Sequence, residues 1–266
     1  MTIAKSLVAD RCILLVLSSS LLTCTDKSDV SHENEYPSSC DFLNLVASRG
    51  CSAGVAASKS TDDEDWDVLP FKNFLGIQGW MKTPSILKKY KVPHVVLTTM
   101  PSVLEHMKDT ANYELCRIHE LPERVRASAK EPSRNITIVH LSVEEYSEEL
   151  DACLMALLEE QHESFFGVVK ETDLVLPSES RFQSRTLFPL PKQSWAKQND
   201  QYTEANIENH RAMVYAFYAP QQVRPDALTA FDTKEMLEHG GYGIIHASTI
   251  LKEILFRLGY TPKYGA

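Results

Sequence analysis

The sequence predicts an α/β protein in which a mostly parallel sheet of about four or five strands carries helices on both faces, preceded by a largely irregular amino-terminal segment. Two observations predict the sheet and its helices. Four short runs beyond residue 90 are apolar almost without interruption, as strands covered on both faces are, and amphipathic helical stretches lie between them. A third predicts the irregular segment: residues 26–67 carry ten acidic and three basic side chains and few apolar runs.

Residues 1–25 have the pattern of a secretory signal peptide. Lys5 and Arg11 precede the apolar run Cys12–Leu17, and the chain turns polar from Thr23 onward. The run is far shorter than the ~20 residues of a bilayer-spanning helix, so we expect no permanent membrane span. We therefore expect residues 1–25 to be a targeting segment that sends the protein to the secretory lumen or outside the cell. An organelle transit segment is the alternative.

We predict that residues 26–68 are an acidic, mostly irregular segment. The run Asp62–Asp67 lacks the glycine turn and the closing glutamate of a calcium loop, which favours a solvated linker. The formal net charge of −9 and the small size of the basic clusters argue against nucleic acid as a partner.

Residues 69–266 are predicted to form a single α/β domain, interrupted by a polar excursion at residues 177–209. Ser142 and Glu145 suggest a capping box that starts a helix over residues 143–158, and Gly259 closes a carboxy-terminal helix that begins at Ile244. Shorter helices are expected near residues 102–108 and 122–130. The predicted strands are His94–Thr98, Ile136–Leu141, Phe165–Val169 and Met213–Tyr218.

The cysteines and one sequon suit an oxidising compartment. Removal of residues 1–25 would leave Cys40, Cys51, Cys116 and Cys153, an even number that permits three pairings. A disulfide between Cys40 and Cys51 is the local option. Asn135, in the sequence Asn-Ile-Thr, is a candidate glycosylation site.

Ligands of open parallel sheets bind outside the carboxyl ends of the strands, and this rule selects candidate site residues without a motif. A hydroxyl, an imidazole and a carboxylate at that edge could serve as nucleophile, base and orienting acid, or as caps and turns. The residues that follow the first three predicted strands are Thr98, Thr99 and Ser102, then His140 and Ser142, then Lys170, Glu171 and Asp173.

A glycine-rich stretch near the carboxy terminus holds two histidines that could act as a general base near neutral pH, His239 and His246. The segment Gly243–Ser248, followed by a helix, resembles the last block of SGNH (GDSL-type) hydrolases, Asp-x-x-His. The resemblance implies ester or glycan chemistry with His246 as base. Gly243 stands where that family has aspartate, so Asp232 or Glu238 is the candidate acid, and Ser102 is the candidate nucleophile. A metal site of His239, His246 and Asp232 lacks supporting ligand spacing, and we expect no cofactor.

Two classes of function remain open, and the sequence leaves undecided whether the chain is an enzyme. The first is a secreted or luminal α/β protein that acts as a binding, accessory or structural subunit of protein partners. It is favoured because Walker, dinucleotide-binding, zinc-protease, nucleophile-elbow and kinase motifs are all missing from the sequence. The alternative is a hydrolase or transferase with a histidine base near the carboxy terminus. A small-molecule or glycan ligand is compatible with both.

Overall fold

The main sheet has eight strands, twice the number of predicted runs. The computed structural model describes residues 9–18, 40–57, 69–75, 85–107, 111–132, 135–174, 176, 197–198, 201–202, 211–219 and 225–261. The strands of the main sheet are β1 (Arg11–Ser18), β2 (Cys51–Ala57), β3 (His94–Thr98), β4 (Tyr113–Leu115), β5 (Ile136–Ser142), β6 (Ser164–Thr172), β9 (Arg211–Tyr218) and β10 (Ile244–His246).

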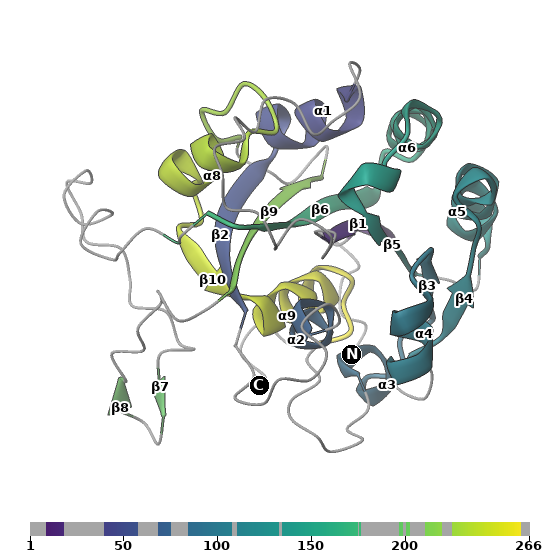
Figure 1. Cartoon of the computed structure of the whole chain (residues 1–266), viewed down its shortest axis with the longest axis horizontal. Coiled ribbons are helices and arrows are strands. Elements are labelled where there is room, and N and C mark those ends of the chain that lie inside the picture. The colour runs from purple at the N-terminus through teal and green to yellow at the C-terminus, as the bar shows by residue number, and fades with distance from the viewer. Residues whose placement is uncertain are drawn as a thin grey trace, which may run out of the picture.

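The strand order is β10-β2-β9-β6-β1-β5-β3-β4 (Figure 1). Strand β9 runs antiparallel to both of its neighbours, β2 and β6, while the other neighbouring strands of the main sheet pair in parallel. Seven strands therefore end at the same edge of the sheet. The α/β class is as predicted, and the sheet is mixed and larger than expected.

Helices cover both faces of the sheet (Figure 1). Side chains alternate along each strand, so Ile13, Leu15 and Leu17 of β1 enter one apolar core, and Cys12 and Leu14 enter the other. The helices of the first core are α1 (Asp41–Arg49), α5 (Leu121–Lys130), α6 (Glu148–Glu160) and α8 (Thr233–His239). Those of the second are α2 (Leu69–Phe74), α3 (Ile86–Lys89), α4 (Pro101–Met107) and α9 (Ala247–Arg257).

The first strand comes from the segment predicted to be a targeting signal. The apolar run Cys12–Leu17 lies inside β1, which pairs in parallel with both β5 and β6, and every residue of the run is buried. An apolar run near a chain start fits a signal peptide and a buried strand equally well. Export of this chain and removal of residues 1–25 stay predictions, but the fold includes residues 11–18 as an internal strand.

The prediction of an irregular segment at residues 26–68 is wrong for its described part. Residues 41–49 form α1 and residues 51–57 form β2. Strand β2 is built from small side chains, Cys-Ser-Ala-Gly-Val-Ala-Ala, all buried, so neither its size nor its hydropathy stands out in the sequence. The acidic run Asp62–Asp67 lies outside the described residues, as does most of the predicted excursion at residues 177–209 apart from a two-stranded ribbon. Its strands are β7 (Lys197–Gln198) and β8 (Gln201–Tyr202).

Two predicted helices begin later than expected. The chain from Val143 to Glu145 forms a short 3-10 turn, and α6 begins at Glu148, where the Ser147 side chain accepts a hydrogen bond from Leu150 N. Residues Ile244–His246 form β10 beside β2 instead of the first turn of α9. The apolar side chains of Ile244 and Ile245 fit either element, and pairing with β2 decides between them. None of the described helices combines the length and hydropathy that a bilayer span requires.

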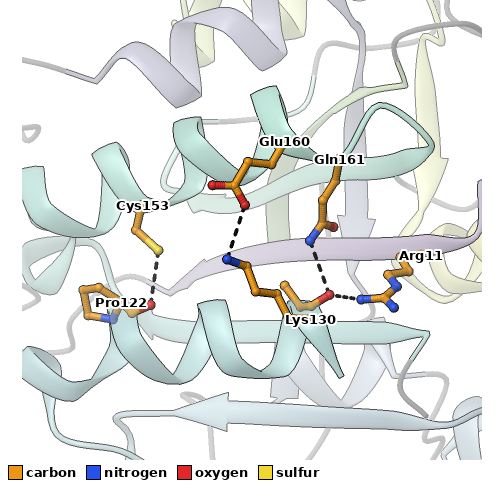
Figure 2. Close-up of polar contacts among 7 residues, drawn as sticks. Arg11, Pro122, Lys130, Cys153, Glu160 and Gln161 are labelled. Atoms are coloured by element: carbon orange, nitrogen blue, oxygen red, sulfur yellow. Dashed lines mark hydrogen bonds and ion pairs between the residues drawn. The ribbon is translucent and has the colours of Figure 1, made fainter. Parts of the chain in front are cut away.

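Near the amino ends of the strands, side chains tie β1 to the helices of the first core (Figure 2). The Arg11 guanidinium and the Gln161 amide both donate to the carbonyl oxygen of Ala129, at the end of α5. Lys130 Nζ lies 3.5 Å from Glu160 Oε2, which joins α5 to α6. Arg11 thus joins β1 to α5, more than a hundred residues further along the chain, and the other two contacts join α5 to the end of α6.

Candidate functional site

Four polar side chains form a row across the carboxyl ends of four neighbouring strands. Thr98 ends β3, His140 lies near the end of β5, Ser18 ends β1, and Glu171 lies near the end of β6. By strand alternation they share the sheet face of the second core, the face that Val16 and Val169 occupy further back along β1 and β6. We call these four residues the polar row.

Hydrogen bonds connect the polar row from end to end. Thr98 Oγ1 lies 3.2 Å from His140 Nδ1, and His140 Nε2 lies 2.9 Å from Ser18 Oγ. The Ser18 hydroxyl donates to Glu171 Oε1 over 3.0 Å. The four strands thus bring a hydroxyl into contact with an imidazole and a carboxylate, although the four residues are widely separated in the sequence.

The polar row is buried. The exposed fractions are 0% for Thr98 and His140, 1% for Ser18 and 2% for Glu171. Phe71 of α2 stacks on the His140 imidazole, with ring centroids 4.1 Å apart and planes 5° from parallel. Burial lowers the pKa of His140 from 6.5 to about 3, so its imidazole is neutral at physiological pH.

A serine hydroxyl in contact with a carboxylate and a ring nitrogen is an arrangement that can support nucleophilic attack. A serine hydroxyl is a weak nucleophile unless an adjacent group accepts its proton, and here a carboxylate lies within hydrogen-bond distance on one side and a ring nitrogen on the other. Because the row lies at the carboxyl edge of the sheet, it also occupies the place where open α/β sheets bind ligands.

A second pair of polar groups lies beside the polar row. The Thr99 hydroxyl donates to Glu145 Oε2 over 2.5 Å, and the same oxygen accepts the backbone N–H of Ser142. These bonds join the loop after β3 to the turn after β5. Thr99 and Ser142 therefore have a structural role, since both bonds hold the loops at the sheet edge together.

The remaining sheet-edge candidates lie apart from the polar row. Lys170 precedes Glu171 along β6 and therefore faces the opposite side of the sheet. Asp173 is exposed in the turn after β6.

Two of the carboxy-terminal candidates have local roles. The exposed Asp232 is the N-cap of α8 and accepts a hydrogen bond from Glu235 N over 2.7 Å. His246 is the N-cap of α9, and its Nδ1 accepts from Ser248 N and lies 2.8 Å from Ser248 Oγ. His239 is exposed in the last turn of α8.

Ser102 and His246 lie far apart in the sheet order. Ser102 follows β3 and His246 ends β10, and six steps between neighbouring strands separate β3 from β10 in the sheet order. At about 4.8 Å per step, the two strands lie roughly 29 Å apart. The structure therefore does not bring Ser102 and His246 together, and the strand order that separates them cannot be read from the sequence.

The structure also bears on the predicted covalent modifications. No disulfide joins Cys40 to Cys51: both are thiols, as are the other cysteines of the described residues. The Asn135 amide is engaged on both atoms, since Nδ2 donates to Asp10 O and Oδ1 accepts from Tyr260 OH. In the described part of the chain, His, Cys, Asp and Glu side chains do not gather in groups of three that could hold a metal ion.

The sheet-edge rule selects three members of the polar row, namely Thr98, His140 and Glu171. It does not select Ser18, because the strand that carries Ser18 has the pattern of a targeting segment. The signal that could have found it is the serine that ends an apolar run of strand length, Cys12–Leu17 followed by Ser18.

Neither a protein-family model nor a curated protein matches the chain. Among solved structures, the PH0037 protein from Pyrococcus horikoshii is similar with a TM-score of 0.55 at 10% identity, over 97% of this chain and 100% of that one. This likeness shows the fold. An alkaline phosphatase from the Antarctic bacterium TAB5 is similar with a TM-score of 0.49 at 10% identity, over 96% of this chain and 99% of that one. The lipoteichoic acid synthase LtaP from Listeria monocytogenes also has a TM-score of 0.49, at 11% identity, over 98% of this chain and 76% of that one.

Proposed function

We propose that this protein is a hydrolase or transferase that acts on ester substrates, with Ser18 as its nucleophile. The observation that supports this function is the contact of one hydroxyl with both a carboxylate and an imidazole at the ligand-binding edge of the sheet. This assignment replaces His246 and Ser102 with residues that are in hydrogen-bond contact.

In the proposed first step, Ser18 Oγ forms a bond to the electrophilic centre of the ester, and the bond to the leaving oxygen breaks. The serine proton passes to a neighbouring side chain and from there to the leaving group. Water in a hydrolase, or a second alcohol in a transferase, then releases the group from Ser18 and returns a proton to it. Because Ser18 is 1% exposed, turnover requires a motion that exposes the polar row to substrate. This motion includes Phe71, whose ring stacks on His140.

The proposal is tested with the full-length protein on a panel of chromogenic carboxylic and phosphoric esters. We expect Ser18→Ala to lower turnover by about a hundredfold or more. Ser164→Ala is the matched control. Ser164 is also a buried strand serine, but its hydroxyl donates to Gln161 Oε1 and it lies at the opposite edge of the sheet. The proposal is contradicted if Ser18→Ala retains turnover, or if the wild-type protein turns over no ester of the panel. Thermal melts of both variants separate loss of activity from loss of folding.

The second candidate is a binding or accessory role, and the near-complete burial of the polar row favours it. In that case the row stabilises the sheet edge, and the protein acts through its surface on protein partners. Ser18→Ala would then lower the melting temperature, and no ester would be turned over.

A further inference from the structure

The direction of the hydrogen bonds in the polar row identifies the proton acceptor. We propose that Glu171, and not His140, takes the Ser18 proton, and that Thr98 is the positioning residue that keeps His140 in the tautomer with its proton on Nε2. This inference rests on the proposed nucleophile Ser18. It assigns to the imidazole the role of a hydrogen-bond donor toward the serine oxygen.

Ser18 has a single hydroxyl hydrogen and two hydrogen-bond partners, His140 and Glu171. The Ser18 hydroxyl donates to Glu171 Oε1, so its single hydrogen points to that carboxyl group. The contact of 2.9 Å between Ser18 Oγ and His140 Nε2 is then a hydrogen bond only if Nε2 carries the proton.

The other ring nitrogen, His140 Nδ1, completes the series of hydrogen bonds. A neutral imidazole has one N–H, so with the proton on Nε2 the atom Nδ1 is an acceptor, and the Thr98 hydroxyl 3.2 Å away is its donor. Thr98 Oγ1 in turn accepts the backbone N–H of Met100 over 3.1 Å. Every hydrogen of the row is used, and the bonds run in one direction from Thr98 to Glu171.

The opposite direction fits the contacts less well. It requires a protonated Glu171 that donates to Ser18, and a proton on His140 Nδ1 that donates to Thr98 Oγ1. The Thr98 oxygen would then accept both the His140 Nδ1–H and the Met100 N–H. The Thr98 hydroxyl hydrogen would find no acceptor among the described residues, although the side chain is 0% exposed. Burial also disfavours the charged imidazole, which supports the count of one N–H.

In the proposed reaction, Glu171 carries the proton between Ser18 and the leaving group. When Ser18 Oγ bonds to the ester centre, its proton moves to the Glu171 carboxylate, and the protonated Glu171 then donates to the departing alkoxide. In the second half, Glu171 accepts a proton from the attacking water or alcohol and returns it to the serine oxygen as the bond between that oxygen and the transferred group breaks. His140 keeps its proton throughout and holds the serine oxygen in place.

The tautomer is measured on full-length, ¹⁵N-labelled protein by long-range ¹H–¹⁵N correlation NMR at pH 7, which distinguishes protonated from bare ring nitrogens. His140→Gln and His94→Gln assign two of the nine histidines. His94 is an internal reference of opposite type, because its Nε2 accepts from Asn112 N and its Nδ1 lies 2.6 Å from the carbonyl oxygen of Val92. We expect an Nε2–H tautomer for His140 and an Nδ1–H tautomer for His94. An Nδ1–H tautomer or an imidazolium at His140 would overturn the inference.

Variants test the roles of Thr98 and Glu171. Thr98→Val removes the donor to Nδ1, and we expect mixed His140 tautomers and a kcat about tenfold lower, with both restored in Thr98→Ser. Thr137→Val, which removes another buried strand threonine that bonds to Ser128, is the control and should keep the tautomer.

Glu171→Gln should lower kcat about a hundredfold and keep the Nε2–H tautomer of His140. An unchanged tautomer in Thr98→Val, or full activity in Glu171→Gln, would refute the corresponding role. Full activity in Ser18→Ala would instead refute the proposed function, so the two failures are distinguishable.

Discussion

At the scale of single residues, the polar row is a set of buried polar groups that depend on one another. Thr98, His140, Ser18 and Glu171 each have a hydrogen-bond partner within the row. Leaving a buried donor or acceptor without its partner costs about 1–3 kcal/mol, so each member stabilises the position of the next. The row is therefore both a candidate site and a determinant of stability.

The buried imidazole predicts a loss of stability in acid. The folded-state pKa of His140 is about 3 and its ordinary value is 6.5, so below pH 6.5 the unfolded chain binds a proton that the folded chain does not. Stability from this group is present above pH 6.5 and falls by up to about 1.4 kcal/mol per pH unit toward pH 3. Urea unfolding at pH 7 to 4.5 should show a shallower acid loss in His140→Gln than in the wild type.

His94 provides the comparison for this measurement. Burial also lowers the pKa of His94, so His94→Gln should reduce the acid loss as well, while the double variant should reduce it further. A wild-type protein and a His140→Gln variant with the same dependence on pH would contradict the burial of a neutral His140.

The cysteines predict insensitivity to reductant. Burial raises the pKa of the Cys40 and Cys51 thiols to about 11, so both are protonated at neutral pH. We expect dithiothreitol to leave the melting temperature unchanged. Alkylation of the unfolded, unreduced chain should label both residues, and a Cys40–Cys51 linked peptide in the mass map would refute this.

At the scale of elements, Asp151 links two helices. Its carboxylate lies in α6, accepts the backbone N–H of Phe42 at the start of α1 over 3.2 Å, and accepts the Tyr146 hydroxyl over 2.5 Å. The side chain is 3% exposed. A carboxylate at the amino end of α1 also interacts favourably with the helix dipole.

Asp151→Ala should therefore destabilise the protein by about 3 kcal/mol, because the Phe42 N–H and the Tyr146 hydroxyl lose a charged acceptor in a buried place. Glu159→Ala changes an exposed carboxylate of the same helix and should stay within about 0.5 kcal/mol of the wild type. Chemical unfolding measures both, and equal stabilities of the two variants would show that Asp151 does not link the helices.

The elements that the sequence predicts are those whose pattern is local. The predicted runs match β3, β5, β6 and β9 because these strands are apolar, flanked by turns and remote from the chain ends. Strand β2 escapes prediction because its side chains are small, and β10 because its three residues continue the apolar pattern of α9. The antiparallel direction of β9 has no sequence signal, since pairing decides it.

The same limit applies to the candidate site. Strand ends could be predicted, so Thr98, His140 and Glu171 could be selected, but their adjacency depends on the order β3-β5-β1-β6, which arises from packing. Ser18 could not be selected from the sequence for a different reason. The physical requirements of a membrane-targeting run and of a buried strand are the same over Cys12–Leu17, namely continuous apolar side chains.

At the scale of the whole molecule, the amino-terminal strand is central. Four strands lie on one side of β1 in the sheet and three on the other, and its side chains enter both cores. Without β1, strands β5 and β6 would lose their common partner, and the polar row would lose Ser18.

Removal of residues 1–25 should therefore abolish cooperative folding. We expect residues 26–266 alone to show no sigmoidal thermal unfolding by circular dichroism, and the full chain to show it. The shortened chain would leave the facing edges of β5 and β6 unpaired and would expose the apolar side chains that pack on β1 in both cores. Amino-terminal sequencing of the protein from its native cells tests the predicted cleavage itself. A cooperative melt of residues 26–266 with the wild-type midpoint would contradict the central place of β1.

The measurement that tests the proposed nucleophile most directly is labelling of the intact protein with a fluorophosphonate probe, which bonds covalently to activated serine hydroxyls, followed by mass mapping of the labelled peptide. We predict a single adduct on Ser18, lost in Ser18→Ala and in Glu171→Gln and retained in Ser164→Ala. A protein that stays unlabelled at Ser18, or an adduct on another serine that persists in Ser18→Ala, would contradict the proposed function.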